Sequence, residues 1–136
     1  MEKYIGTKII QAEPQIKDGV DGYKVVYSDN YISWSPKNVF EEAYREIDNM
    51  TFGLALEALR KGFKVARKGW NGKNMFLYYV SDGKYPAKTD IAKTISDENG
   101  NVQYCGYIAI KTVQGYVSPW NPSQMDMLAE DWIIVE

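Results

Sequence analysis

A tight turn between two apolar segments constrains this chain most. Asn71-Gly72 is preceded by the run Lys64 to Ala66 and followed by the run Met75 to Val80, both of strand character. Because Asn and Gly tolerate positive φ, this dipeptide between apolar runs predicts a β-hairpin. The turn also carries Trp70 and is flanked by three cations, Arg67, Lys68 and Lys73.

Two interpretations of Trp70 are open from the local sequence. A flat aromatic ring on a tight turn beside cations can stack a base and neutralise a phosphate. Alternatively, the indole packs at the end of the core, because tryptophan side chains are usually buried to a large extent. The cations Arg67 and Lys68 are likewise phosphate partners in the first interpretation and ordinary surface charges in the second.

Composition excludes several classes of function. The net charge of the 136 residues is −2, so the basic face that DNA or RNA binding requires is not expected. The chain has no histidine, which excludes Ser-His and Cys-His catalysis and His-ligated metal sites. Carboxylates such as Glu130 and Asp131 lack a recognisable perturbing partner, so acid–base catalysis is not indicated. We expect no metal and no cofactor.

The single cysteine, Cys105, excludes a disulfide within the chain. It precedes an apolar run and is expected to be a buried, inert thiol. No segment approaches the roughly 20 apolar residues of a membrane span, and Met1 to Gly6 lacks the apolar character of a signal peptide. We therefore expect a cytosolic protein without a membrane partner.

Residues 1–48 are predicted to form an N-terminal module of strand, hairpin and helix. The first strand is expected from Tyr4 to Ala12, closed by Pro14, and a polar loop from Lys17 to Gly22 follows. The hairpin is expected to pair Tyr23 to Tyr27 with Tyr31 to Trp34.

Ser35 and Pro36 predict the start of an amphipathic helix in this module. Serine can cap the free backbone N–H groups, and proline fits the first helical position. The predicted apolar face of the helix consists of Val39, Phe40, Ala43, Tyr44 and Ile47.

Residues 50–136 are predicted to form the main domain. Thr51 is expected to cap a helix from Phe52 to about Lys61, with Gly62 ending it. The strands around Trp70 come next. The polar segment Ser81 to Asn101 is expected to be a long loop, with a short helix or strand around residues 89–95.

The remaining elements complete an antiparallel sheet. A strand is expected from Tyr104 to Val113, a turn at Gln114-Gly115, a short strand from Tyr116 to Pro119 and a closing strand from Asp131 to Val135. The predicted fold is α+β, with a mostly antiparallel sheet and short helices packed on it.

Asn121-Pro122-Ser123-Gln124 predicts a further helix, with Asn121 as its cap and its end at Leu128. This start places an indole (Trp120), an amide and a hydroxyl beside free N–H groups that favour an anion. The alternative is simple capping, with Trp120 closing the core.

Three blocks of sequence carry a resemblance to a known family. They run from Met50 to Leu77, including Ala-Arg-Lys-Gly-Trp-Asn-Gly, from Tyr107 to Thr112, and from Val117 to Trp132, including Pro-Trp-Asn-Pro-Ser-Gln-Met-Asp-Met-Leu-Ala-Glu-Asp-Trp. Over residues 50–135 the chain resembles the Thoeris anti-defence protein two family of phages and prophages. Residues 1–48 lie outside that pattern and look like an added phage module.

The resemblance implies a sponge, not an enzyme. Such proteins bind the cyclic ADP-ribose signal of Thoeris, such as glycocyclic ADP-ribose, in the cytoplasm of the infected host, and they do not cleave it. Family members form homotetramers with signal pockets at subunit interfaces. Some also bind cyclic di- or trinucleotides of cGAS-like defence systems in a separate pocket.

The resemblance also implies roles for residues at matching positions. Trp70 and Trp120 would stack on a base or form pocket walls, and Phe52 and Met75 would be further wall residues. Asn71, Ser123 and Gln124 would donate hydrogen bonds, with the helix start at Asn121 near the phosphates. Arg67 and Lys68 would be charge partners.

Two other hypotheses stay open. A nucleotide-degrading enzyme would release a cleaved product, whereas a sponge would return its ligand intact. A phage structural or interaction protein without a small ligand would use its tyrosine-rich surface as a protein interface, and no cyclic nucleotide would stabilise it.

Overall fold

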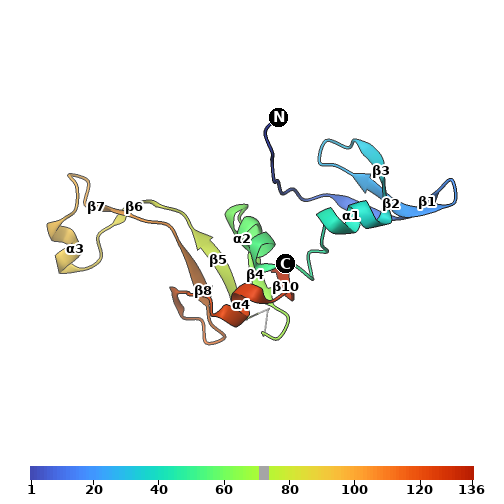
Figure 1. The fold of residues 1–136 in the computed structure, drawn as a ribbon. Coiled ribbons are helices and arrows are strands. Elements are labelled where there is room, and N and C mark those ends of the chain that lie inside the picture. The colour runs from blue at the N-terminus through green and yellow to red at the C-terminus, as the bar shows by residue number, and fades with distance from the viewer. Residues whose placement is uncertain (71–73) are drawn as a thin grey trace. The chain divides into compact units, whose positions relative to one another are not determined.

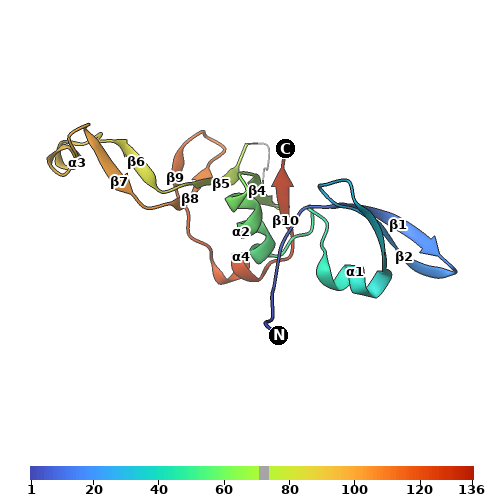
Figure 2. The ribbon, with the colours of Figure 1, turned by 90° about the horizontal axis from the view of Figure 1, so that it is seen from above.

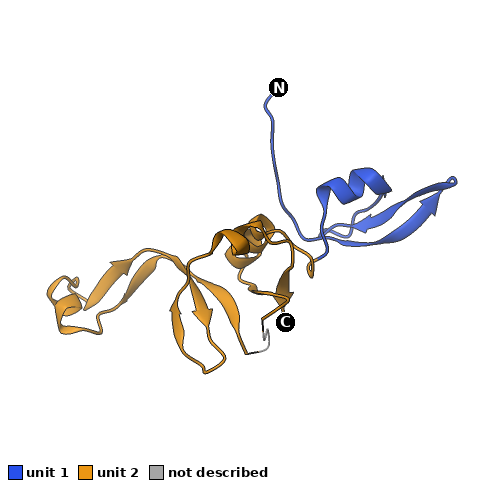
Figure 3. Cartoon of the chain, turned by 60° about the horizontal axis from the view of Figure 1, so that its bottom comes forward, with its two compact units in different colours: residues 1–46 blue, residues 47–136 orange. Residues whose placement is uncertain are grey.

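The computed structural model describes residues 1–70 and 74–136. The chain divides into two compact units, Met1–Glu46 and Ile47–Glu136, which are shown in Figure 3. The predicted Asn71-Gly72 turn and Lys73 lie outside the described residues.

Unit 1 is a three-stranded antiparallel sheet with one helix. The strands β1 (Gln11–Lys17), β2 (Val20–Val26) and β3 (Ile32–Pro36) are ordered β1-β2-β3, and α1 (Lys37–Ala43) follows β3 (Figure 1). The hairpin expected between β2 and β3 is present. Phe40 of α1 stacks on Tyr23 of β2 with ring centroids 4.1 Å apart, so α1 covers the sheet face that contains Tyr23.

The first strand is not where the sequence predicted it. The expectation of a strand from Tyr4 to Ala12 closed by Pro14 is wrong, because β1 begins at Gln11 and contains Pro14. An edge strand tolerates proline, since one side of its backbone has no ladder partner. The predicted polar loop shrinks to Asp18-Gly19, whose φ values of 50° and 77° are typical of a tight hairpin turn.

The start of α1 also differs from the prediction. Pro36 occupies the N-cap position without a side-chain cap, and the Ser35 hydroxyl donates to the Pro36 carbonyl at 3.4 Å instead. Ser35 cannot cap because it is still paired with Tyr23 in the sheet. The helix ends at Ala43, so Ile47 is not part of its apolar face.

Unit 2 is built on a five-stranded antiparallel sheet of order β10-β4-β5-β8-β9 (Figure 2). The strands are β4 (Lys64–Arg67), β5 (Phe76–Val80), β8 (Tyr107–Lys111), β9 (Val117–Pro119) and β10 (Trp132–Val135). The helix α2 (Phe52–Arg60) packs on one face and forms the core with the central strands. The buried core residues are Met50, Ala55, Ala58, Leu59, Val65, Leu77 and Trp132. The α+β prediction is confirmed.

The predicted limits of α2 are confirmed by its capping. The Leu54 backbone N–H donates to the Thr51 hydroxyl at 3.3 Å, and Gly62, with φ of 93°, follows the helix. We expect Thr51→Ala to lower the free energy of unfolding by about 1 kcal/mol, because one N–H of the first turn loses its acceptor. Chemical denaturation would measure it, with Thr51→Ser as the control that keeps the hydroxyl; equal losses in both variants would contradict the capping argument.

The segment predicted as a long loop is mostly ordered. Its strands β6 (Gly83–Pro86) and β7 (Asn101–Tyr104) pair antiparallel, and α3 (Asp90–Thr94) lies between them. The short helix is as expected, but the loop prediction is wrong for the strands. Their side chains are largely exposed, so the alternation of apolar and polar residues that marks a half-buried strand is weak.

Cys105 is exposed, so its prediction as a buried thiol is wrong. The sequence predicted a single strand from Tyr104 to Val113 that includes Cys105. In the structure β7 ends at Tyr104 and β8 begins at Tyr107, so Cys105 lies in the connection between them. Within the described residues, no helix has both the length and the apolar character needed to cross a bilayer.

Candidate functional site

An aromatic cluster forms one end of the core of unit 2. The fully buried indole of Trp132 lies at its centre, with ring centroids 5.4 Å from Phe52, 5.6 Å from Trp70 and 6.0 Å from Trp120. The planes of Trp70 and Trp120 are tilted by 74° and 82° to that of Trp132, the edge-to-face arrangement that aromatic pairs favour. The three outer rings, Phe52, Trp70 and Trp120, are only half-buried.

Backbone hydrogen bonds bring these rings together from distant parts of the chain. Trp132 and Met50 exchange N–H···O bonds of 2.8 and 3.1 Å, which places the start of α2 beside β10. The Trp70 N–H donates to the Arg67 carbonyl in the turn after β4, and the Trp120 N–H donates to the Ile108 carbonyl, both at 2.9 Å. The two indole-bearing stretches singled out in the sequence therefore meet within one chain.

The helix α4 (Gln124–Leu128) begins at the edge of this cluster. Ser123 is its cap: the Asp126 N–H donates to Ser123 Oγ at 3.0 Å, and the Ser123 N–H donates to Asp126 Oδ2 at 2.9 Å. The prediction of Asn121 as the cap is wrong, because the reciprocal pairing of Ser with an acid three residues later fixes the start. Trp132 Nε1–H donates to the Asp126 carbonyl at 2.9 Å and anchors α4 to the aromatic cluster.

This start is less suited to an anion than the sequence indicated. The helix has five residues, and the Asp126 carboxylate already occupies its first turn. A carboxylate there neutralises the positive end of the helix and accepts an N–H that a phosphate would need. The Ser123 hydroxyl is itself engaged with Asp126, since it accepts the Asp126 N–H and hydrogen-bonds to the carboxylate.

Arg67 is held by two carboxylates. Its Nε donates to Asp131 Oδ1 at 2.9 Å, and its Nη1 donates to Asp126 Oδ1 at 3.1 Å. Hydrogen bonding to Asp131 is the main reason that the pKa of Arg67 is raised, and burial opposes it. The guanidinium thus links β4 to α4 and to the start of β10, and its charge is balanced inside the protein. The sequence interpretation missed both partners, although Arg67 and Trp132 are opposite in the sheet, which places Asp131 alongside.

The same contacts act on Asp126. Burial favours the neutral acid, but hydrogen bonds from Ser123 and the charge of Arg67 outweigh it, so the pKa of Asp126 is lowered. A folded-state pKa below the unfolded value of about 3.9 stabilises the protein above that pH, and the contribution is lost as the pH falls through the folded-state value.

We therefore expect Asp126→Asn to be less stable than the natural protein at neutral pH, by an amount that shrinks below about pH 4. Melting curves of both proteins between about pH 6 and pH 3 would measure the difference in stability. The other carboxylates are present in both proteins, so their titration cancels in this difference. A difference in melting temperature that does not change with pH would contradict ionisation of Asp126 as its cause.

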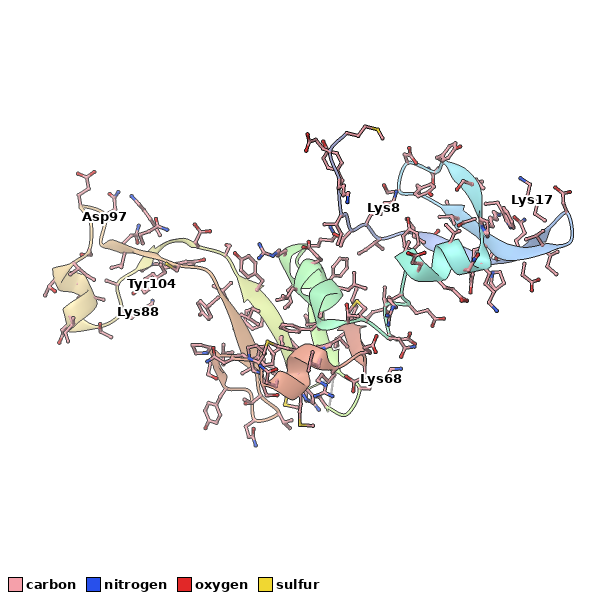
Figure 4. All side chains as sticks on the ribbon, in the orientation of Figure 1. Lys8, Lys17, Lys68, Lys88, Asp97 and Tyr104 are labelled. Carbon is pink, nitrogen blue, oxygen red and sulfur yellow. The ribbon has the colours of Figure 1, made fainter. Side chains whose placement is uncertain are left out.

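The other residues predicted for the site are not among the rings of the aromatic cluster. Lys68, labelled in Figure 4, is exposed, and its Nζ donates to Asn49 Oδ1 at 2.6 Å. Met75 is half-buried before β5, while Asn121 and Gln124 are exposed around the start of α4. Asn71 lies outside the described residues.

The side chains gathered here are of the kinds that bind flat, polar ligands. They offer half-buried aromatic faces together with hydroxyl and amide groups, and the described residues contain no group of three or more Cys, Asp or Glu placed to hold a metal ion. The fold and the cluster define a small α+β protein in which aromatic side chains gather against the core of an antiparallel sheet.

Comparison with known proteins gives the family. Residues 50–135 match the family model described as the Thoeris anti-defense 2-like domain, so the chain belongs to this family. Thoeris anti-defense 2 of Bacillus phage SP01 is 43% identical over 86 residues, which cover 63% of this chain and 94% of that protein. The matched segment contains the aromatic cluster, Arg67 and both of its carboxylate partners.

Proposed function

We propose that this protein is a phage immune-evasion protein that binds and sequesters a cyclic ADP-ribose signal of Thoeris defence, such as glycocyclic ADP-ribose, without cleaving it. It acts in the cytoplasm of the infected bacterium. The observation that carries the proposal is the aromatic cluster, in a chain of the Thoeris anti-defense 2-like family.

The ligand's chemistry suits this cluster. Adenine is a flat ring that stacks on aromatic side chains, and Trp70 and Trp120 present half-buried indoles 6.3 Å apart, next to Phe52. The ribose hydroxyls need donors and acceptors, which Ser123 and Gln124 supply at the edge of the cluster.

The pyrophosphate needs positive charge. Arg67 is neutralised by Asp126 and Asp131, which makes it a positioning residue for α4 in this proposal. Lys68 is the better phosphate partner, because its ammonium group is exposed and its partner, the Asn49 amide, is neutral.

Binding without cleavage needs affinity and no general base. No histidine is present, and the carboxylates nearest the cluster, Asp126 and Asp131, are engaged by Arg67. In this proposal the half-buried cluster is completed by a second copy of the chain in a homotetramer. Cyclic di- or trinucleotides of cGAS-like defence are further ligands to be tested.

Recovery of the ligand tests the proposal. The full chain is incubated with cyclic ADP-ribose isomers, separated from free ligand, denatured, and the released molecule is identified by mass spectrometry. We expect intact ligand in a fixed ratio to protein. A cleaved product would establish a nucleotide-degrading enzyme, and no retained ligand from any isomer would favour a protein-interaction role.

A further inference from the structure

Unit 1 contains a surface hollow that lies outside the matched family segment. Its volume is about 400 Å³, and it lies between the end of β1 and the start of β3. This volume is within the range of small-molecule sites. The hollow is lined by Gln15, Ile16, Lys17, Ile32, Ser33 and Trp34.

The indole of Trp34 forms a fixed wall of this hollow. Its Nε1–H donates to the Gln15 carbonyl at 2.9 Å, so the side chain reaches from β3 across β2 to β1. The indole lies against Gly22 of β2, where an added Cβ would collide with the indole and with the Ser35 carbonyl. Glycine inside a strand is unfavourable on its own and typically marks a close approach of this kind.

A fixed indole is a good stacking surface. Its hydrogen-bond donor is already satisfied and its orientation is set by the backbone, so little conformational freedom is lost when a flat ligand binds. One large apolar side chain on the same sheet face, that of Ile32, remains 56% exposed. Burying Ile32 would add to the affinity of any ligand that stacks on the indole.

A cation, Lys17, lies beside the indole. Strand register places Trp34, Lys24, Glu13 and Lys17 on the sheet face opposite to α1. Among the ion pairs of the described residues, Lys24 is matched by Glu13 at 3.8 Å, whereas none includes Lys17. The Lys17 Nζ lies 5.7 Å from the Trp34 ring centre, at the end of β1 (Figure 4). Its flexible side chain can move aside and meet an anion at the rim.

We propose that this hollow binds a nucleobase carrying a phosphate, as in a free nucleotide or a single strand of nucleic acid. The base stacks on Trp34, and Lys17 meets the phosphate. Gln15 offers its side-chain amide to the base edge and the sugar. The site is separate from the aromatic cluster of unit 2 and does not depend on the function proposed for that cluster.

Titration of the full chain with four probes tests this: adenosine 5′-monophosphate, adenosine, ribose 5-phosphate and a short oligothymidylate. NMR of the indole N–H signals, with Trp34→Phe to assign the Trp34 signal, reports binding at this position. We expect adenosine 5′-monophosphate to shift the Trp34 signal saturably. Adenosine and ribose 5-phosphate should each bind at least about 10-fold more weakly. Much tighter binding of the oligothymidylate would identify a single strand as the source of the base and phosphate.

Variants separate this site from the other. Lys17→Gln should weaken binding of adenosine 5′-monophosphate about 10-fold and leave adenosine unchanged, while Lys24→Gln is the control on the same face. Trp70→Ala should leave the Trp34 response intact, so failure of the function proposed for unit 2 would be seen separately. A Trp34 signal that no probe shifts, or an affinity that Lys17→Gln leaves unchanged, would overturn the proposal.

Discussion

Trp70→Ala is expected to weaken the binding of cyclic ADP-ribose strongly while the protein stays folded. The indole of Trp70 is half-buried and lies edge-to-face with Trp120 and Trp132, so part of its surface is available to a ligand. Loss of one stacked aromatic ring costs about 1–3 kcal/mol, which is about 5- to 150-fold in affinity. The packing interpretation predicts instead that the variant unfolds.

Thermal shift distinguishes the two interpretations. For the natural protein, ligand at about 100 times its dissociation constant should add about 2.7 kcal/mol, or about 10–20 °C in a unit of this size. Trp70→Ala should lose between about a third and nine-tenths of this shift but keep a cooperative transition without ligand. Tyr116→Ala removes an exposed aromatic ring of the same unit and should keep the full shift. If Trp70→Ala has no transition of its own, the indole is a packing residue.

The sequence predicted the elements of unit 2 better than the partners of its charged groups. The capped helix α2 is evident from Thr51 and Gly62, because capping is a local property. The pairing of Arg67 with Asp126 and Asp131 joins residues 59 and 64 positions apart. Such a contact depends on strand register, which no local pattern of one sequence reveals. Of the two cations predicted to meet the phosphate, Arg67 is neutralised by the fold and Lys68 is not.

The central position of Trp132 was equally hidden in the sequence. It stands at the start of a short apolar strand, where burial of one face is expected but the partners are not. Trp70 and Trp120 were recognised by their local turns and by the family resemblance, and the structure adds the ring that joins them. At Pro14 a local rule misled the prediction. Proline usually ends a strand, but β1 continues through Pro14 because an edge strand tolerates proline.

Trp132→Ala is expected to have the largest effect on stability in unit 2. The side chain is fully buried and contacts all three outer rings of the aromatic cluster, so its removal leaves a cavity and an unpaired Asp126 carbonyl. Removal of a buried tryptophan costs about 3–5 kcal/mol, and the melting temperature should fall by at least about 12 °C.

Trp132→Phe separates the two contributions, because it keeps an aromatic ring in the core but loses the Nε1–H bond that anchors α4. We expect a melting temperature between those of the natural protein and Trp132→Ala, since a buried carbonyl without a partner costs about 1–3 kcal/mol. If α4 positions Ser123 and Gln124 for the ligand, Trp132→Phe should weaken binding in calorimetry while Phe52, Trp70 and Trp120 are unchanged. Unaltered affinity in a destabilised Trp132→Phe protein would limit the binding site to the aromatic faces and remove α4 from it.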